Sequence, residues 1–96
     1  MVTVRIEHPV QSFGAWKGAF DADPLDRRGS GVRRYQILRP LDDPAFVMID
    51  LDFDSEQQAA EFLTAMRRVW RSPQAAPALG GEPRARVVQA AETVSL

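Results

Sequence analysis

The chain has 96 residues, of which 45% are hydrophobic and 26% charged, and these ordinary globular values predict one folded domain over residues 1–96. With no cysteine and one histidine, the composition excludes a disulfide framework, a thiolate nucleophile and a metal site built from several such ligands. A net charge of −1 with mixed signs disfavours nucleic-acid binding, and no apolar run is long enough to span a membrane. Because the first residues lack the pattern of a secretory signal, we expect a cytoplasmic protein.

Residues 2–8 alternate apolar with polar side chains, the period-two pattern of a strand with one buried face. His8 falls on the apolar face of this strand. A helix is predicted next, with Ser12 as its N-cap and an apolar stripe of aromatic residues at helical spacing. That stripe consists of Phe13, Trp16 and Phe20. Asp23-Pro24 ends the helix, and the turn-forming residues that follow, to position 31, predict a loop that borders a site.

A hairpin and a second helix follow in the central part of the chain. Residues 32–39 and 46–53 have the pattern of two strands, and the short connection between them is rich in proline and aspartate, which favours an antiparallel hairpin. Ser55 and Gln58 have the spacing of a capping box, and the apolar residues after them recur at three and four positions, which predicts a helix to Trp70. After a flexible Ala/Pro/Gly connection, residues 84–94 are predicted to form the last strand.

The order strand, helix, hairpin, helix, strand predicts an α+β domain of ferredoxin-like β-α-β-β-α-β topology. Right-handed crossovers place both helices on one face of the antiparallel sheet. The other face is then bare and carries Phe46 and Met48, which predicts that a second copy covers it in a homodimer. Polar residues on that face are expected to form ion pairs between the subunits. These residues are Arg5, Glu7, Arg34, Gln36, Asp50 and Asp52.

Several stretches carry a resemblance to a known family: His8-Pro9-Val10, the aromatic stripe, Gly31–Tyr35 and the strand around Asp50. With them the chain resembles, from Val2 to Thr93, the dimeric α+β barrel proteins of the antibiotic-biosynthesis-monooxygenase-like superfamily. The resemblance implies a pocket between sheet and helices, lined by aromatic and a few polar residues. Members include cofactor-free monooxygenases, haem-degrading enzymes, isomerases and polyketide cyclases, so the fold alone does not select a reaction. The chain contains no asparagine, which separates it from relatives that use an Asn–Trp pair.

The residues at pocket positions suggest acid–base chemistry on a flat ligand. His8 is the candidate base, because an unperturbed imidazole titrates near pH ~6.5. Tyr35 is its candidate partner, as a hydrogen-bond donor to a substrate carbonyl. The candidate ligand-binding residues are Trp16, Phe20, Phe62, Met66 and Trp70. Core packing explains the same aromatic pattern, and a strand-end position explains His8 without a function.

Two charged patterns were weighed as ion-binding sites. Asp50, Asp52 and Asp54 share one side of a strand, but side chains at this spacing lie ~6.6 to 7 Å apart, too wide for one cation, so no metal site is predicted. The second pattern is a run of arginines that would suit a phosphate or carboxylate, or would be solvated or paired. It comprises Arg27, Arg28, Arg33, Arg34 and Arg39.

We therefore expect a homodimer that binds a small aromatic or acidic metabolite and transfers a proton without a bound cofactor. The alternative is a non-catalytic dimer, ligand-sensing or purely structural, with no active site. The sequence leaves the substrate, the reaction and enzymatic activity itself open.

Overall fold

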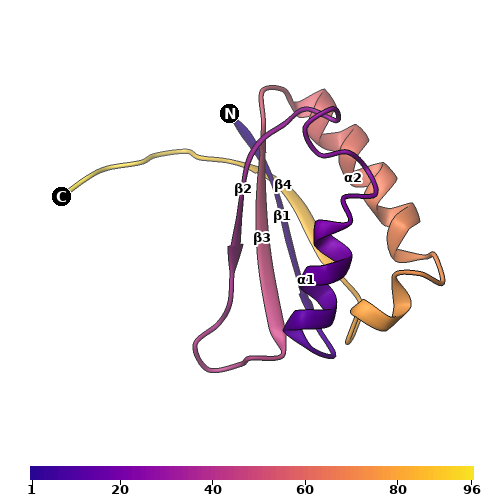
Figure 1. Ribbon diagram of the computed structural model, residues 1–96. Coiled ribbons are helices and arrows are strands. Elements are labelled where there is room, and N and C mark those ends of the chain that lie inside the picture. The colour runs from indigo at the N-terminus through magenta and orange to yellow at the C-terminus, as the bar shows by residue number, and fades with distance from the viewer.

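The computed structural model describes residues 1–96 and shows a four-stranded sheet of order β2-β3-β1-β4, in which all neighbours are antiparallel. Its elements are β1 (Val2–Pro9), α1 (Phe13–Asp21), β2 (Val32–Leu38), β3 (Phe46–Phe53), α2 (Glu56–Trp70), the short 3-10 helix η1 (Ala76–Ala78) and β4 (Arg84–Gln89). Both helices lie on one side of the sheet, and the other side is uncovered (Figure 1). The predicted ferredoxin-like α+β architecture is confirmed. No helix combines the length and the apolar character needed to cross a membrane.

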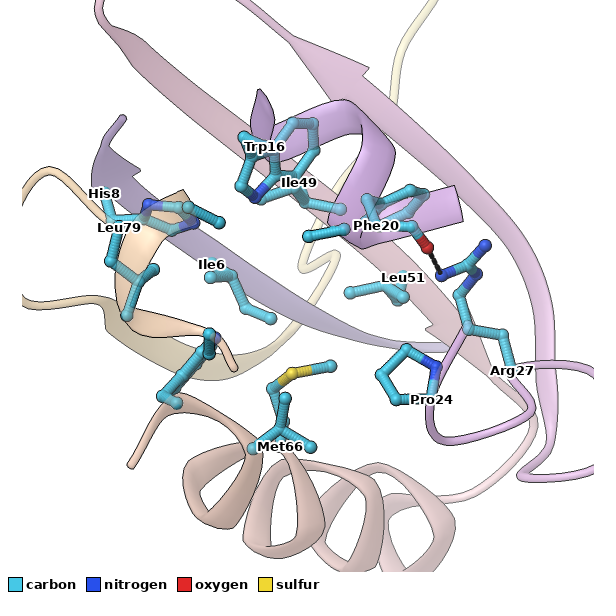
Figure 2. Close-up of a pocket in the computed structure, with 15 residues that line it drawn as sticks. Ile6, His8, Trp16, Phe20, Pro24, Arg27, Ile49, Leu51, Met66 and Leu79 are labelled. Atoms are coloured by element: carbon cyan, nitrogen blue, oxygen red, sulfur yellow. Dashed lines mark hydrogen bonds between the residues drawn. The ribbon is translucent and has the colours of Figure 1, made fainter. Parts of the chain in front are cut away.

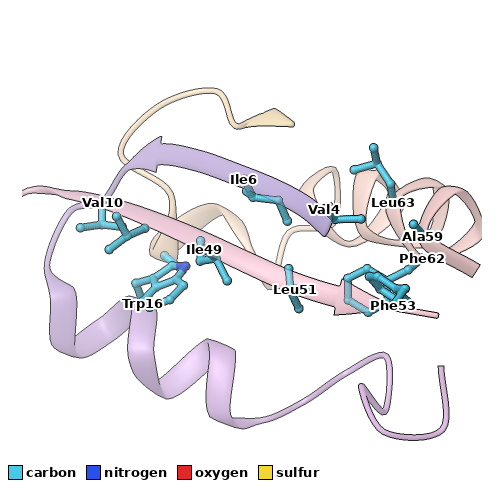
Figure 3. Packing of buried hydrophobic residues seen from close by; sticks show 12 residues of the cluster. Val4, Ile6, Val10, Trp16, Ile49, Leu51, Phe53, Ala59, Phe62 and Leu63 are labelled. Carbon is cyan, nitrogen blue, oxygen red and sulfur yellow. The ribbon is translucent and has the colours of Figure 1, made fainter. Parts of the chain in front are cut away.

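The core lies between the covered face of the sheet and the two helices. Side chains alternate strictly along β3, where Val47, Ile49, Leu51 and Phe53 are buried and the residues between them are half-buried. The inward residues of β1 continue this layer, and α2 covers one end of it with Ala59, Phe62 and Leu63 (Figure 3). Trp16 of α1 covers the other end (Figure 3). The period-two pattern of the strands thus builds one apolar layer beneath both helices.

Serine side chains begin both helices, as the sequence predicted. The Ser12 hydroxyl accepts a hydrogen bond from the backbone N–H of Ala15 at 3.1 Å. The Ser55 hydroxyl accepts one from the N–H of Gln58 at 3.2 Å. Each bond satisfies one of the N–H groups that a helix start leaves without a partner inside the helix.

The last strand is shorter than the sequence pattern suggested. β4 ends at Gln89 rather than at Val94, because its register places Gln89 opposite Val2, the first residue of β1. Beyond that point β1 offers no backbone groups for pairing, and residues 90–96 run away from the helices as an exposed extension (Figure 1). The segment expected to be a flexible connection contains η1, whose Ala78 is buried.

Four of the six polar residues of the uncovered face form ion pairs within the chain, where the sequence led us to expect pairs between subunits. Arg5 donates to both carboxylate oxygens of Asp50, from Nε and Nη2, each at 2.9 Å. The Arg34 Nε donates to Asp52 at 3.1 Å, and the Thr3 hydroxyl donates to the same carboxylate at 2.6 Å. Cross-strand register brings these partners together, since Arg5 faces Asp50 and both Thr3 and Arg34 face Asp52.

Candidate functional site

A cavity of about 90 Å³ lies between the sheet and the helices, and 12 of its 15 lining residues are hydrophobic (Figure 2). Ile6 of β1 with Ile49 and Leu51 of β3 lines it on the side of the sheet. The other walls come from α1, α2, the loop after α1 and the segment around η1. Polar groups enter this apolar space at only a few points, which is the usual composition of a small-molecule site.

His8 lies at one end of the cavity, with only 2% of its surface exposed. Its Nδ1 is 2.7 Å from the backbone carbonyl oxygen of Pro9. A carbonyl only accepts, so Nδ1 carries the proton, and in the neutral ring Nε2 then holds a free lone pair. The backbone contact therefore fixes both the tautomer and the orientation of the imidazole.

The Nε2 atom of His8 is open to the cavity. No buried side-chain nitrogen or oxygen in the protein lacks a hydrogen-bond partner. The Nδ1 contact is the only hydrogen bond of His8, so Nε2 is not sealed inside the protein, and the space that His8 lines is this cavity. The free lone pair thus faces an apolar chamber.

Burial lowers the pKa of His8 below its ordinary value of 6.5, because the surroundings disfavour the charged ring, while the contact with Pro9 opposes this shift. The imidazole is consequently neutral near pH 7 and able to accept a proton.

A chain of aromatic rings extends from His8 along the cavity. The rings of His8 and Trp16 meet edge to face with centroids 6.2 Å apart, and they stand together in Figure 2. Trp16 also contacts Phe13 at 5.8 Å and Phe20 at 5.1 Å. The indole N–H of Trp16 has no protein partner and, like Nε2 of His8, is not sealed. The cavity thus presents one acceptor and one donor near each other, between aromatic walls.

Arg27 stands at the opposite end of the cavity from His8 (Figure 2). Its Nη1 donates to the backbone carbonyl of Phe20 at 2.7 Å, and its guanidinium carbon lies 3.9 Å from the centre of the Phe20 ring. Sequence reasoning noticed Arg27 only as one member of an arginine run. Nothing in its local spacing showed that the loop folds back over α1 to reach the cavity.

Four of the five predicted ligand-binding residues line the cavity, together with His8: Trp16, Phe20, Met66 and Trp70. Phe62 does not line it, since this ring is buried in the core against Phe53, with centroids 5.3 Å apart. Tyr35 also lies outside the lining: it stands on the edge strand β2, 43% exposed, with its ring 5.0 Å from that of Phe20. His8 and Tyr35 are thus not brought together around one space.

Most of the other charged residues that the sequence singled out are engaged in contacts on the surface. The Nη2 atom of Arg33 pairs with Asp54 at 2.7 Å, and the guanidinium of Arg39 lies over the ring of Phe13 at 4.1 Å. The three aspartates of the β3 region are each bonded to an arginine rather than grouped around one point. These residues are therefore engaged in contacts within the chain rather than arranged around a bound ion.

No family model matches the chain, and no curated protein does. Solved structures match over nearly its whole length. One is SnoaB, a cofactor-independent oxygenase from Streptomyces nogalater, at 17% identity over 97% of this chain and 95% of that one, with a TM-score of 0.67. Another is a monooxygenase from the gene ActVA-Orf6 of Streptomyces coelicolor in complex with nanaomycin D, at 15% identity over 99% and 91%, with a TM-score of 0.65. A third is a dimeric ferredoxin-like protein from an uncultured marine organism, at 9% identity over 97% of both chains, with a TM-score of 0.67.

These likenesses establish the fold of the chain. The expected similarity to antibiotic-biosynthesis-monooxygenase-like α+β barrel proteins is confirmed at that level. The function has to be argued from the cavity itself.

Proposed function

We propose that this protein is a homodimer, and that each protomer binds a flat aromatic compound in the His8 cavity and removes a proton from it. The proposal starts from the fold, which the chain shares with antibiotic-biosynthesis-monooxygenase-like proteins. The observation that carries the proposal is the free Nε2 of a buried, neutral histidine facing an apolar cavity. Such an atom is placed to accept a proton from a ligand that fills the cavity.

The chemistry begins with a base whose orientation is fixed. Nε2 accepts a proton from an acidic C–H or O–H group of the ligand, and the imidazolium that forms keeps its bond from Nδ1 to Pro9. The indole N–H of Trp16 lies beside His8 and would donate to the oxygen on which negative charge develops. His8 thus accepts the proton, and Trp16 stabilises the negative charge that the proton leaves behind.

The aromatic class of ligand follows from the walls. Trp16, Phe20 and Trp70 line the cavity, and flat rings gain both apolar burial and ring contacts there. A neighbour of the same fold was solved in complex with nanaomycin D, which supports the proposal that this fold holds a small organic ligand.

The cavity volume limits the part of a ligand that enters. About 90 Å³ is less than the ~150 Å³ of an engineered protein cavity that binds benzene. One ring therefore enters with adjustment of the walls, and Met66, a flexible lining residue, is suited to that adjustment. A larger ligand would insert only its leading ring.

The homodimer is supported by the uncovered sheet face and by a dimeric neighbour of the same fold. Leu38, Phe46 and Met48 form an apolar end of this face, where the register places Leu38 opposite Met48. Exposed sheet with such side chains is typical of a surface that a second copy covers.

Proton transfer is tested by hydrogen–deuterium exchange of a neutral single-ring ketone. In deuterated water near neutral pH, the protein is expected to speed loss of the methyl proton signals of 4-hydroxyacetophenone in proton NMR. His8→Asn retains a donor near the Nδ1 position but has no Nε2 base, so the protein-dependent rate should fall about 10²-fold. Leu41→Ala, at a fully exposed position outside the cavity lining, serves as the control and should retain the rate. Equal rates for His8→Asn and the unaltered protein would remove the role of His8.

A structural dimer without an active site is the second candidate, and the small volume of the cavity favours it. Under this alternative the aromatic rings are core packing alone. Saturation-transfer NMR with 4-hydroxyacetophenone separates the two candidates, because a purely structural dimer would give no transfer to this compound.

A further inference from the structure

We infer that the ligand of the His8 cavity is an aromatic carboxylic acid whose carboxylate lies against Arg27, while its ring extends toward His8. This inference rests on the proposed function and adds the substrate class and its orientation. It follows from one juxtaposition: Arg27 lines both the apolar cavity and a second, cationic groove on the outside of the domain.

The Arg27 guanidinium is held in place before any ligand arrives. Its side chain is only 15% exposed and is fixed by the Phe20 carbonyl at 2.7 Å and by stacking on the Phe20 ring. The carboxylate of Asp23 lies 3.5 Å from Nη1 and also accepts from the backbone N–H of Arg27 at 2.9 Å. All three contacts anchor the group, so little side-chain freedom remains to be lost on binding.

Arg27 still has donors to offer. Both of its side-chain contacts with oxygen use Nη1, and no hydrogen bond occupies Nε or Nη2. Since no buried side-chain nitrogen lacks a partner, these donors reach the open space that Arg27 borders. A guanidinium edge with free N–H groups matches the two oxygens of a carboxylate.

The groove beyond Arg27 is lined mainly by arginines. It has a volume of about 320 Å³ and is lined by four arginines and one aspartate, together with Val32 and Tyr35. The four arginines are Arg27, Arg28, Arg33 and Arg34. Asp54 and Asp52 neutralise Arg33 and Arg34, but Arg28 has no ion-pair partner. With Asp23 beside Arg27, carboxylates offset three of the four arginines, and the one unpaired positive charge of the groove is that of Arg28, next to Arg27 in the chain.

Tyr35 lies at the rim of this groove. Its ring touches Phe20 at 5.0 Å and lies 5.1 Å from the Arg27 guanidinium carbon, and its hydroxyl makes no hydrogen bond within the protein. Tyr35 therefore lies beside Arg27 rather than beside His8.

The two ends of the cavity therefore differ in what they recognise. His8 offers a lone pair and suits a weakly acidic proton, whereas Arg27 offers N–H donors and suits an anion (Figure 2). A ligand with an acidic group at one end of a ring and a carboxylate at the other satisfies both, in one orientation only.

The test compares two probes with the same ring and phenol. 4-Hydroxybenzoate carries a carboxylate at neutral pH, and methyl 4-hydroxybenzoate is its neutral ester. We expect the acid to bind about tenfold more tightly than the ester in ligand-observed NMR titrations, as one hydrogen bond to a charged group implies. Arg27→Gln should abolish this preference, and Arg68→Gln, at an exposed arginine of α2 that lines neither the cavity nor the groove, should preserve it.

A salt series on the unaltered protein keeps the test independent of how Arg27→Gln folds. Raising the ionic strength from ~0.01 to ~1 M should weaken binding of the acid and leave the ester unchanged. Equal affinities of the two probes, or equal salt dependence, would overturn this inference and leave the proposed function standing. Binding of neither probe would overturn both.

Discussion

His8 illustrates how one backbone contact can set the chemistry of a side chain. The strand ends at Pro9, whose carbonyl faces Nδ1 at 2.7 Å, so the proton stays on the side away from the cavity. Burial then keeps the ring neutral by lowering its pKa. The same desolvation that keeps His8 unprotonated also links its protonation to folding.

We predict a pH dependence of stability that belongs to His8. The unfolded chain takes up a proton at the ordinary pKa of 6.5, whereas the folded state resists protonation until a lower pH. The free energy of unfolding should therefore fall as the pH drops below 6.5, by at most about 1.4 kcal/mol per pH unit. Below the folded-state pKa this contribution no longer changes.

Urea unfolding of the unaltered protein and of His8→Asn, at pH ~7 and pH ~5.5, measures this effect within the range where histidine titrates. The loss of stability between the two pH values should be smaller in the variant, because the carboxylates contribute equally to both proteins. The same loss in both would contradict the lowered pKa.

At the residue scale, sequence reasoning succeeded where local periodicity determines the position. Alternation along β1 placed His8 on the buried face, and helical spacing placed Trp16 and Phe20 in the cavity wall. It failed for Tyr35 and Arg27, whose positions depend on the edge location of β2 and on the path of the loop after α1. No local pattern encodes either of these.

At the scale of elements, the strength of the sequence signal varied with its physical source. The second helix was predicted well because a cap and a long apolar periodicity agree. The end of β4 was predicted too late: Thr93 and Val94 are residues that favour strands, but a strand needs a neighbour to pair with, and β1 supplies none beyond Val2. Strand length is thus a property of the pair rather than of one segment.

Alanine substitutions at two glycines, one in a packed segment and one at an open position of a helix, test how the elements pack. A Cβ at Gly80 would lie 2.8 Å from the carbonyl carbon of Val10, so the backbone itself blocks it, whereas a Cβ at Gly14 in α1 meets nothing within 4 Å. Gly80→Ala should destabilise the protein by about 1 to 3 kcal/mol. Gly14→Ala should stabilise it by ~0.5 to 1 kcal/mol through helix propensity.

Thermal unfolding followed by circular dichroism distinguishes these variants, because 1 kcal/mol moves the Tm of a domain this size by roughly 4 to 8 °C. Opposite shifts are expected for the two substitutions. A Tm unchanged by Gly80→Ala would show that the segment after η1 does not pack on Val10 as described.

At the scale of the whole molecule, the fold covers only one face of the sheet (Figure 1). Two ion pairs of the other face, Arg5–Asp50 and Arg34–Asp52, are formed within the chain, so a partner need not supply counter-charges for these residues and can cover the apolar end. In such a dimer, the charges that become buried at the interface are already paired, which lowers the free-energy cost of removing them from water.

We predict that Met48→Glu disrupts this dimer, because it places a charge in the apolar end of the face. Analytical ultracentrifugation should give the 10.7 kDa of one chain for the variant and twice that mass for the unaltered protein. Leu41→Glu, at a fully exposed position of the hairpin, is the control and should remain a dimer. A monomeric unaltered protein would refute the homodimer directly.

The protein contains two tryptophans, and both line the cavity. All of its indole fluorescence therefore originates from the walls of one chamber, and the single histidine contributes one imidazole signal set from the same place. The unlabelled protein therefore reports on its own cavity, because a compound that enters it should change the indole emission and the imidazole chemical shifts together.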